Sequence, residues 1–253
     1  MTSSSDRERL RQEHDPSAVR ERLSEPPRPS YLGDAVLGAI DGAVTTFAVV
    51  AGVAGGGLPA MVAVILGLAN LLADGFSMAV SNYQAARSQH HELDQVRARE
   101  RRHIRLVPEG EREEVRQLFA AKGLEGETLE RVVETITSDE GRWVETMVQE
   151  EHGLTPHAPA PLRAALATAA AFLAVGLIPL LPYLVPVLDP PARFPASAVL
   201  TGVAFFGVGA VKGRLVERPA GRTGLETLAM GGAAAALAYL VGAGLRALVD
   251  VPL

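Results

Sequence analysis

Two neighbouring apolar stretches of this sequence carry side chains that could bind a cation. Asp34 and Asp41 lie seven residues apart in the first stretch, and Asn70, Asp74 and Met78 follow at four-residue steps in the second. On helices these spacings place each set near one face. Carboxylates in apolar surroundings need a counter-charge, and no Lys or Arg occurs here, so a metal ion or a proton is the expected partner. Oxygen ligands suit Mg²⁺, Ca²⁺ or Mn²⁺, whereas a thioether favours a softer metal such as Fe²⁺.

A second set of potential metal ligands lies in a polar segment further along. Glu100 and His103 are three residues apart, and Glu111 and Glu114 repeat that spacing on the next expected helix. The last helix of the segment ends with further candidates, Met147, Glu150, Glu151 and the adjoining His152. Ligand pairs at one-turn spacing on facing helices are how helical bundles build di-metal sites. A solvated, salt-bridged face of Glu-rich helices is the alternative interpretation.

Long uncharged runs indicate how the first set is held in place. They cover 42–73, interrupted by a glycine-rich turn at 55–59, and then 164–188, 194–211 and 227–245. A helix needs roughly 20 apolar residues to cross a hydrocarbon core of about 30 Å. The sequence therefore predicts an all-α, polytopic membrane protein with five transmembrane helices, at about 33–55, 59–86, 162–187, 194–214 and 224–248.

Small residues and prolines predict how these helices pack. Gly38 and Gly42 permit close contact of the first span with a neighbour. Near the end of the third span, Pro179, Pro182 and Pro186 remove backbone donors. Inside a membrane, neighbouring helices must then satisfy the freed backbone groups.

The distribution of basic residues predicts the orientation in the membrane. Residues 1–30 carry six Lys and Arg, residues 87–163 carry twelve, and the turn at 55–59 carries none. By the positive-inside bias, the N-terminus and residues 88–158 lie in the cytoplasm. The low hydrophobicity of residues 1–30 indicates a mostly disordered tail. Four parts result: this tail, transmembrane helices 1–2 at 31–87, a cytoplasmic helical metal-binding domain at 88–158, and transmembrane helices 3–5 at 159–253.

The cytoplasmic domain, residues 88–158, is called the insert below and is expected to be a small helical bundle. The second span continues into it without a breaker as far as Pro108, and helices ending at Gly123 and Gly153 follow, the latter with Ser138 as its candidate N-cap. Seven apolar side chains are expected to face inward: Leu118, Phe119, Val132, Val133, Ile136, Trp143 and Met147.

Composition excludes several classes of function. The chain has no cysteine, which rules out thiolate ligands and disulfides, and its net charge of −5 gives no reason to expect nucleic-acid binding. Glu100 and His103 form the only Glu-x-x-His pair, whereas ferritin-like oxidases place one on each of two helices. No nucleophile elbow or phosphate-binding glycine loop is present. We therefore do not expect an enzyme.

Several motifs together resemble the vacuolar iron transporter family. They are "GDAVLGAIDGAVTTFAVVAG", "ANLLADGFSMAVSNYQAARS", "VPEGEREEV" and "WVETMVQEEHGL", and the resemblance extends from about residue 31 to residue 250. It implies a five-span homodimer that exchanges cytosolic Fe²⁺, and often Mn²⁺, for protons. It also implies a transport path at the dimer interface, lined by the first two spans, and a cytoplasmic domain that gathers metal.

The resemblance assigns roles to individual residues. Asp41 and Met78 match the expected ligands of the transport path, whereas Asn70 stands where plant members have a glutamate; Asp74, one turn along, is expected to compensate. His103 stands where a further glutamate is usual. The remaining matches in the insert are the metal-binding glutamates and a methionine, at Glu100, Glu111, Glu114, Glu151 and Met147.

The hypothesis from the sequence is a proton-coupled exporter of Fe²⁺, and also of Mn²⁺, in a bacterial cytoplasmic membrane. Its partners are transition-metal ions, protons, the lipid bilayer and a second copy of the chain. No prosthetic group is expected, and Fe²⁺, Mn²⁺ or Zn²⁺ is the bound ion. The alternative is a membrane-anchored metal buffer or sensor, in which the spans only tether the insert.

Overall fold

The computed structural model describes residues 4–24, 29–186 and 188–248 of the chain. The chain divides after Ser30 into two compact units. All regular structure in the described residues is helical, without a strand. The prediction of an all-α protein is therefore confirmed.

The first unit contains two short helices where a mostly disordered tail was expected. These are α1 (Ser4–Glu13) and α2 (Pro16–Ser24), and the described side chains of both are largely exposed. Residues with high helix propensity, mainly Arg, Glu, Gln and Leu, dominate both segments. Asp15 begins α2, because its carboxylate accepts hydrogen bonds from the backbone N–H and the hydroxyl of Ser17. Local propensity and capping explain the difference from the expectation.

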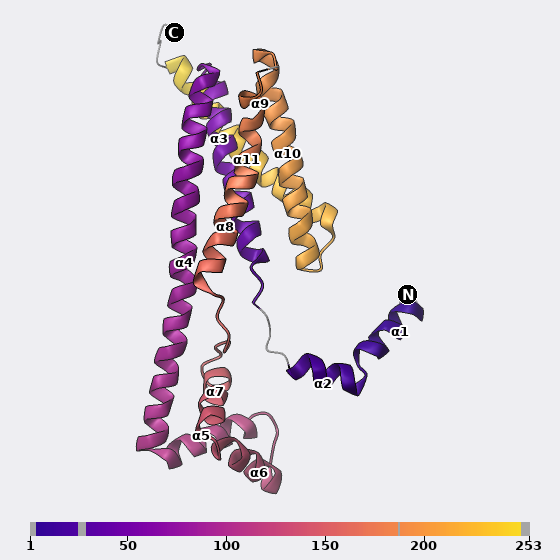
Figure 1. The fold of residues 1–253 in the computed structure, drawn as a ribbon, viewed down its shortest axis with the longest axis vertical. Helices are drawn as coiled ribbons and strands as arrows, with labels where there is room; N and C mark the ends of the chain where they lie inside the picture. The colour runs from indigo at the N-terminus through magenta and orange to yellow at the C-terminus, as the bar shows by residue number, and fades with distance from the viewer. Residues whose placement is uncertain (1–3, 25–28, 187, 249–253) are drawn as a thin grey trace. The chain divides into compact units, whose positions relative to one another are not determined.

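The second unit contains five helices long and apolar enough to cross a membrane (Figure 1). They confirm the predicted number of spans. In chain order they are α3 (Leu32–Gly55), α4 (Ala60–Leu106), α8 (Pro161–Gly176) with its continuation, α10 (Pro190–Leu215) and α11 (Ala220–Leu248). The continuation of α8 is a 3-10 turn, η1 (Ile178–Leu180), followed by α9 (Leu181–Leu184).

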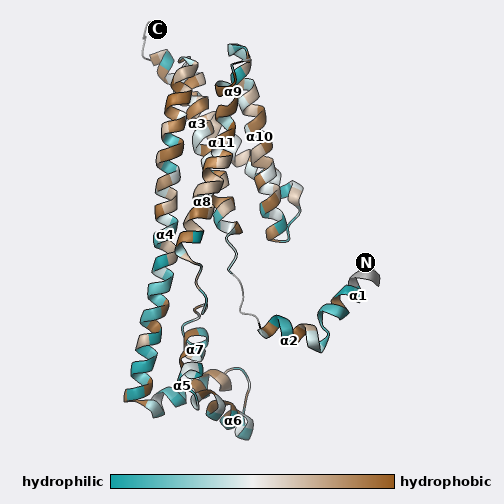
Figure 2. Cartoon of the chain, viewed as in Figure 1, coloured by the Kyte–Doolittle hydropathy of each residue, from teal (hydrophilic) through white to brown (hydrophobic). Residues whose placement is uncertain are grey.

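Helix α4 runs without interruption for 47 residues, as the absence of a breaker before Pro108 predicts. Its first part is apolar and its second part is polar (Figure 2). The chain turns at Val107, and Pro108 occupies the first turn of α5 (Pro108–Ala120), where its missing N–H costs nothing. Since one helix spans both regions, the two sets of candidate ligands are linked by a continuous rigid element.

The insert has a hydrophobic core of its own. The polar part of α4 packs with α5, α6 (Gly126–Thr137) and α7 (Glu140–Glu150). All seven side chains predicted to face inward belong to this core or pack against it, and the most buried members of the core are Val115, Val133, Val144, Met147 and Val148. This packing fixes how α4, α5 and α7 present their polar faces to one another.

The N-cap of α7 is Asp139 rather than Ser138. The Asp139 carboxylate accepts a hydrogen bond of 2.7 Å from the backbone N–H of Arg142, whereas the Ser138 hydroxyl donates to a carbonyl of the preceding helix. Both residue types cap helices, and the extended backbone at Asp139 selects it. Gly153, with a positive φ, follows the end of α7 as predicted.

In the membrane region, α3 and α8 approach so closely that only glycine fits at their contact. A Cβ atom at Gly38 would lie 2.2 Å from the carbonyl oxygen of Thr168, and one at Gly42 would lie 2.4 Å from that of Phe172. The prediction of close packing through these two glycines is confirmed. The contact fixes the face that α3 presents to α4.

The prolines near the end of the third span are compensated by a neighbouring helix. The buried hydroxyl of Ser197, in α10, donates a hydrogen bond of 2.6 Å to the carbonyl oxygen of Pro179. Pro182, three residues after Pro179, has no N–H to offer that carbonyl. A side chain from α10 therefore supplies the donor that the broken helix lacks. Pro186 follows α9 in the loop before α10.

Candidate metal sites

The membrane region brings Asp41 of α3 close to Asp74 of α4. Both side chains are half-buried, and the two carboxylates are near enough for their like charges to interact. The sequence contains no Lys or Arg between Leu32 and Ala86, so no basic side chain of these apolar segments can neutralise them. A carboxylate pair of this kind can hold a cation or protons.

Asp34 lies in a separate hydrogen-bond network near the start of α3. Its Oδ1 accepts a hydrogen bond of 2.9 Å from Nδ2 of Asn82, which also lies 2.7 Å from Oγ1 of Thr168 and 3.2 Å from the carbonyl oxygen of Ala164. The network joins α3, α4 and α8. Asp34 thus has a hydrogen-bond partner, whereas the carboxylates of Asp41 and Asp74 have none in the described part of the chain.

Asn70 and Met78 lie on α4, one turn to either side of Asp74. The Asn70 amide nitrogen is buried and has no hydrogen-bond partner among the described residues, which is unusual for a polar group inside a protein. Met78 is half-buried. The predicted face of α4 is therefore present, with an amide and a thioether flanking the carboxylate of Asp74.

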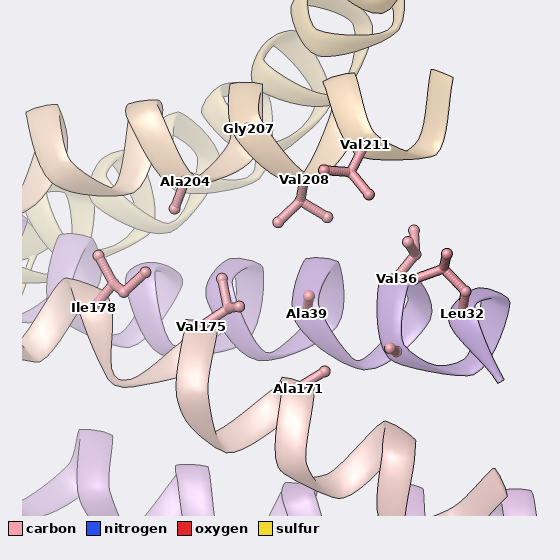
Figure 3. Close-up of a pocket in the computed structure, with 11 residues that line it drawn as sticks. Leu32, Val36, Ala39, Ala171, Val175, Ile178, Ala204, Gly207, Val208 and Val211 are labelled. Carbon is pink, nitrogen blue, oxygen red and sulfur yellow. The ribbon is translucent and has the colours of Figure 1, made fainter. Parts of the chain in front are cut away.

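An apolar cavity of about 370 Å³ lies between α3, α8 and α10. Figure 3 shows Val36 and Ala39 of α3, Ala171 of α8, and Val208 and Val211 of α10 around it. All of its lining residues are apolar or glycine. The cavity offers no side-chain ligand for a metal ion, so the polar faces of α3 and α4 are the candidates in the membrane region.

The insert gathers Glu100 and His103 of α4 with Glu111 of α5. The three side chains each offer a ligand atom, and these atoms lie within 4.8 Å of one another. The Glu111 Oε1 is 3.2 Å from Nδ1 of His103. Both carboxylates are buried, whereas His103 is about half exposed. This group brings together three of the residues that the sequence predicts as ligands.

A second group of three ligands includes Glu100 again, now with Glu151 and His152. Nε2 of His152 lies 3.0 Å from Oε1 of Glu100 and 3.7 Å from Oε2 of Glu151. Their ligand atoms also lie within 4.8 Å of one another. Glu151 and His152 follow α7 directly, and both of their backbone N–H groups donate to the carbonyl of Met147. The end of α7 thus carries two ligand atoms to Glu100.

The carboxylates of this cluster are poorly compensated. Oε2 of Glu100 and Oε2 of Glu111 are buried and have no hydrogen-bond partner in the described part of the chain. Burial, followed by the charges of Glu114 and Glu100, raises the pKa of Glu111 to about 7, and His103 opposes the shift. Burial also raises the pKa of Glu151. A bound cation would supply the missing positive charge and would be the missing partner of these carboxylate oxygens.

Three other predicted residues lie around this cluster rather than in it. Glu114 is exposed and borders, with Glu151, a surface pocket of about 270 Å³ between α5 and the end of α7. Glu150 forms an ion pair with Lys122. Met147 is fully buried in the core of the insert. Glu150 belongs to no group of three acidic or histidine ligand atoms among the described residues.

His152 was named only as the neighbour of Glu151 at the end of the last helix, and its position against Glu100 was not predicted. The sequence places His152 next to Glu151, but its spacing from Glu100 along the chain is 52 residues and carries no helical periodicity. The available signal was the enrichment of histidine, because five of the six histidines lie in the insert. Thr168, the partner of Asn82, was missed for the same reason.

These observations define a class: a helical membrane protein with carboxylate and histidine clusters suited to divalent metal ions. The sequence profile of the VIT family matches residues 32–243. The chain is 32% identical over 210 residues to "Vacuolar iron transporter 2" of Oryza sativa subsp. japonica, covering 81% of this chain and 84% of that protein. It is equally similar to "Vacuolar iron transporter 1" of Arabidopsis thaliana, with 32% identity over 209 residues and coverage of 81% and 82%.

A protozoan relative matches a longer part of the chain. "Vacuolar iron transporter" of Toxoplasma gondii is 29% identical over 232 residues, covering 88% of this chain and 77% of that protein. The chain belongs to the VIT family. It is a multi-pass membrane protein of a metal-ion transporter family, as the resemblance of its motifs predicts.

Proposed function

We propose that this chain exports Fe²⁺, and also Mn²⁺, from the cytoplasm in exchange for protons. The observation that carries the proposal is the Asp41–Asp74 pair on the packed helices α3 and α4. Two uncompensated carboxylates in a membrane bind a divalent cation, and protonation removes the charge that holds it. Iron as the cargo comes from the names of the relatives.

Proton exchange follows from the same two side chains. Binding a dication to Asp41 and Asp74 neutralises them, and so does adding two protons. Because both states are neutral, the site can open first to one face of the membrane and then to the other without exposing an unpaired charge to lipid. Met78, one turn from Asp74, adds a soft ligand that favours Fe²⁺ over Mg²⁺ and Ca²⁺.

A homodimer completes the proposed path. In the described residues of one chain, no third acidic or histidine side chain joins Asp41 and Asp74 in a ligand group. The adjoining face of α4 is apolar and exposed, with Met61, Ile65, Leu72 and Phe76 all at least 60% exposed. We propose that a second copy packs near this face and brings its own α3 and α4 to the path.

The insert is proposed to collect metal on the cytoplasmic side. The basic residues of 1–30 and 87–163 favour a cytoplasmic N-terminus and insert by the positive-inside bias. The buried, unpaired oxygens of Glu100 and Glu111 support metal capture there. We assign the protein to the cytoplasmic membrane of a cell, with export as the direction of transport.

The test is metal flux in liposomes that contain the purified full-length protein and a metal-sensitive dye. We expect Fe²⁺ and Mn²⁺ entry to rise when a pH gradient drives protons outward, and to fall when an ionophore removes the gradient. Flux that ignores the gradient would contradict proton exchange. Metal binding without flux under any condition would instead identify a tethered buffer or sensor.

A further inference from the structure

We propose that His152 is a metal ligand that forms, with Glu100 and Glu151, a second cation position in the insert. The first position lies at His103 and Glu111, and Glu100 is common to both. The inference rests on the capture role proposed for the insert and deepens it, because it names a further ligand and the class of ion that the cluster selects.

The geometry of His152 fits coordination. Its Nε2 faces two carboxylate oxygens, at 3.0 Å from Glu100 and 3.7 Å from Glu151. Ligands bound at about 2.0–2.2 Å to one ion lie roughly 3–3.6 Å apart. The two distances from Nε2 are therefore already near the spacing that a shared ion requires, and all three ligand atoms lie within 4.8 Å of one another. A cation can replace the hydrogen bond between the imidazole and Glu100.

If His152 had only a structural role, one carboxylate oxygen of Glu100 would have no partner. One hydrogen bond from the imidazole serves Oε1 of Glu100, but Oε2 of the same side chain is buried and has no partner among the described residues. Glu100 is only 2% exposed, so water does not compensate this oxygen. Buried carboxylates that serve the fold alone are normally paired or fully hydrogen-bonded. An ion that uses both oxygens of Glu100 removes the discrepancy.

Three basic side chains of the insert form ion pairs with carboxylates outside this cluster. Within the described part of the insert, Arg97 pairs with Glu145, Arg116 with Glu113 and Glu130, and Lys122 with Glu150. No Lys or Arg ion pair there includes Glu100, Glu111 or Glu151. Bound ions or protons can therefore supply the positive charge that this cluster needs.

The ligand set indicates the class of ion. Each position offers one imidazole nitrogen and two carboxylates, and Glu100 can bridge the two ions. Imidazole suits Fe²⁺, Zn²⁺ and other late first-row metals, whereas Mg²⁺ and Ca²⁺ prefer oxygen alone. His152 therefore adds to the selection of transition metals over the much more abundant Mg²⁺.

The direct test is nuclear magnetic resonance of the full-length protein, labelled with nitrogen-15 histidine and held in detergent micelles. Zn²⁺ serves as the probe because it is redox-inert and diamagnetic. The variants His103→Ala and His152→Ala assign the two sets of ring-nitrogen signals. We expect Zn²⁺ to shift both sets to positions typical of metal-bound imidazole. A His152 signal that stays unchanged when His103 is saturated would overturn the proposal.

Binding stoichiometry gives a second test, with His157→Ala as the matched control because His157 is exposed and lies outside both ligand groups. We expect His152→Ala to lose one bound Zn²⁺ per chain, or to bind it at least tenfold more weakly, while His157→Ala binds like the wild type. Unchanged stoichiometry and affinity in His152→Ala would contradict the proposal. Circular dichroism of the metal-free variants checks their folding.

The two proposals fail in different ways. If the liposomes show metal flux but Zn²⁺ does not shift the His152 signals, only the ligand role of His152 is wrong. If Zn²⁺ shifts the His152 signals but the liposomes show no metal flux, the transport proposal is wrong and the ligand assignment stands.

Discussion

The two acidic sites of this protein share one helix, α4, but differ in density and surroundings. In the membrane, α3 and α4 contribute two neighbouring carboxylates, Asp41 and Asp74, with an amide and a thioether nearby. In the insert, the same helix meets α5 and the end of α7 and gathers three carboxylates and two imidazoles into overlapping ligand groups. The smaller number of ligands belongs to the site proposed to transport the ion, and the larger number to the site proposed to capture it.

A sparse site suits release, and a dense site suits capture. Each carboxylate placed in the membrane costs several kcal/mol unless it is neutralised. The membrane region therefore tolerates few carboxylates, and each must bind either a metal ion or a proton. The insert adjoins water and tolerates more charge, held in place by a well-packed core. Four predictions separate the two sites, in order of decreasing effect.

The largest effect is expected for Glu100→Gln. Glu100 belongs to both ligand groups, so its loss should weaken Zn²⁺ binding at both positions by more than tenfold. The metal-free variant should unfold at the same or a higher temperature than the wild type, because it no longer buries an unpaired carboxylate. Binding isotherms and thermal unfolding without metal measure the two effects. Wild-type Zn²⁺ affinity in this variant would contradict the shared role of Glu100.

The second prediction is a pH dependence centred on Glu111, whose pKa is raised to about 7, first by burial and then by Glu114 and Glu100. Metal must displace this proton, so affinity should fall about tenfold per pH unit below about 7. In the metal-free protein the folded state holds the proton more tightly than the unfolded chain. The stability that this adds is fully present below the usual pKa and is lost as the pH rises through about 7.

Mn²⁺ isotherms across this pH range measure the effect, and Glu111→Gln is the matched variant. The variant should bind Mn²⁺ more weakly at neutral pH but with a shallower dependence on pH. An affinity that is flat with pH in the wild type would show that Glu111 does not bind the ion.

The third prediction concerns the membrane region, which is held by close backbone contacts rather than by charge. Ser197→Ala removes the donor to the Pro179 carbonyl and should lower the free energy of unfolding by about 1 kcal/mol. Ser81→Ala, which changes an exposed serine of α4, is the control. Thermal unfolding in micelles compares the two, and Zn²⁺ binding by the insert should be unaffected in both. Equal unfolding temperatures would mean that another group satisfies Pro179.

The smallest effect is expected for Glu150→Gln. Glu150 pairs with Lys122 at the surface and belongs to neither ligand group. Zn²⁺ stoichiometry and affinity should stay within about twofold of the wild type, as for most surface substitutions. A loss of one bound ion in this variant would extend the cluster beyond the residues assigned to it and would restore the ligand role that the sequence suggested.

Periodicity and charge-free runs were enough to predict the five spans, the continuation of α4 to Pro108 and the pairing of Glu100 with His103. These features depend on local rules, namely helix length, proline geometry and one-turn spacing. The close contact at Gly38 and Gly42 also follows from residue size alone. Local rules therefore account for most of the membrane region.

Features that depend on how helices meet could not be predicted. His152 reaches Glu100 only because α7 packs on α4, with Met147 of α7 buried in the core of the insert. The sequence suggested Glu150 as a ligand and gave no sign that His152, two residues further on, lies against Glu100, because the rotation of α7 about its axis is set by tertiary packing. In the membrane region, the Asn82–Thr168 contact was missed for the same reason.

The central claim is that the membrane pair moves the ion and the insert collects it. The most direct measurement is the initial rate of Mn²⁺ flux in liposomes against Mn²⁺ concentration, for the wild type, Asp41→Asn and the double variant Glu111→Gln/Glu114→Gln. We predict that Asp41→Asn lowers the maximal rate at least tenfold, whereas the double variant keeps it within about twofold and needs more Mn²⁺ to reach half of it. A wild-type maximal rate in Asp41→Asn would contradict the account.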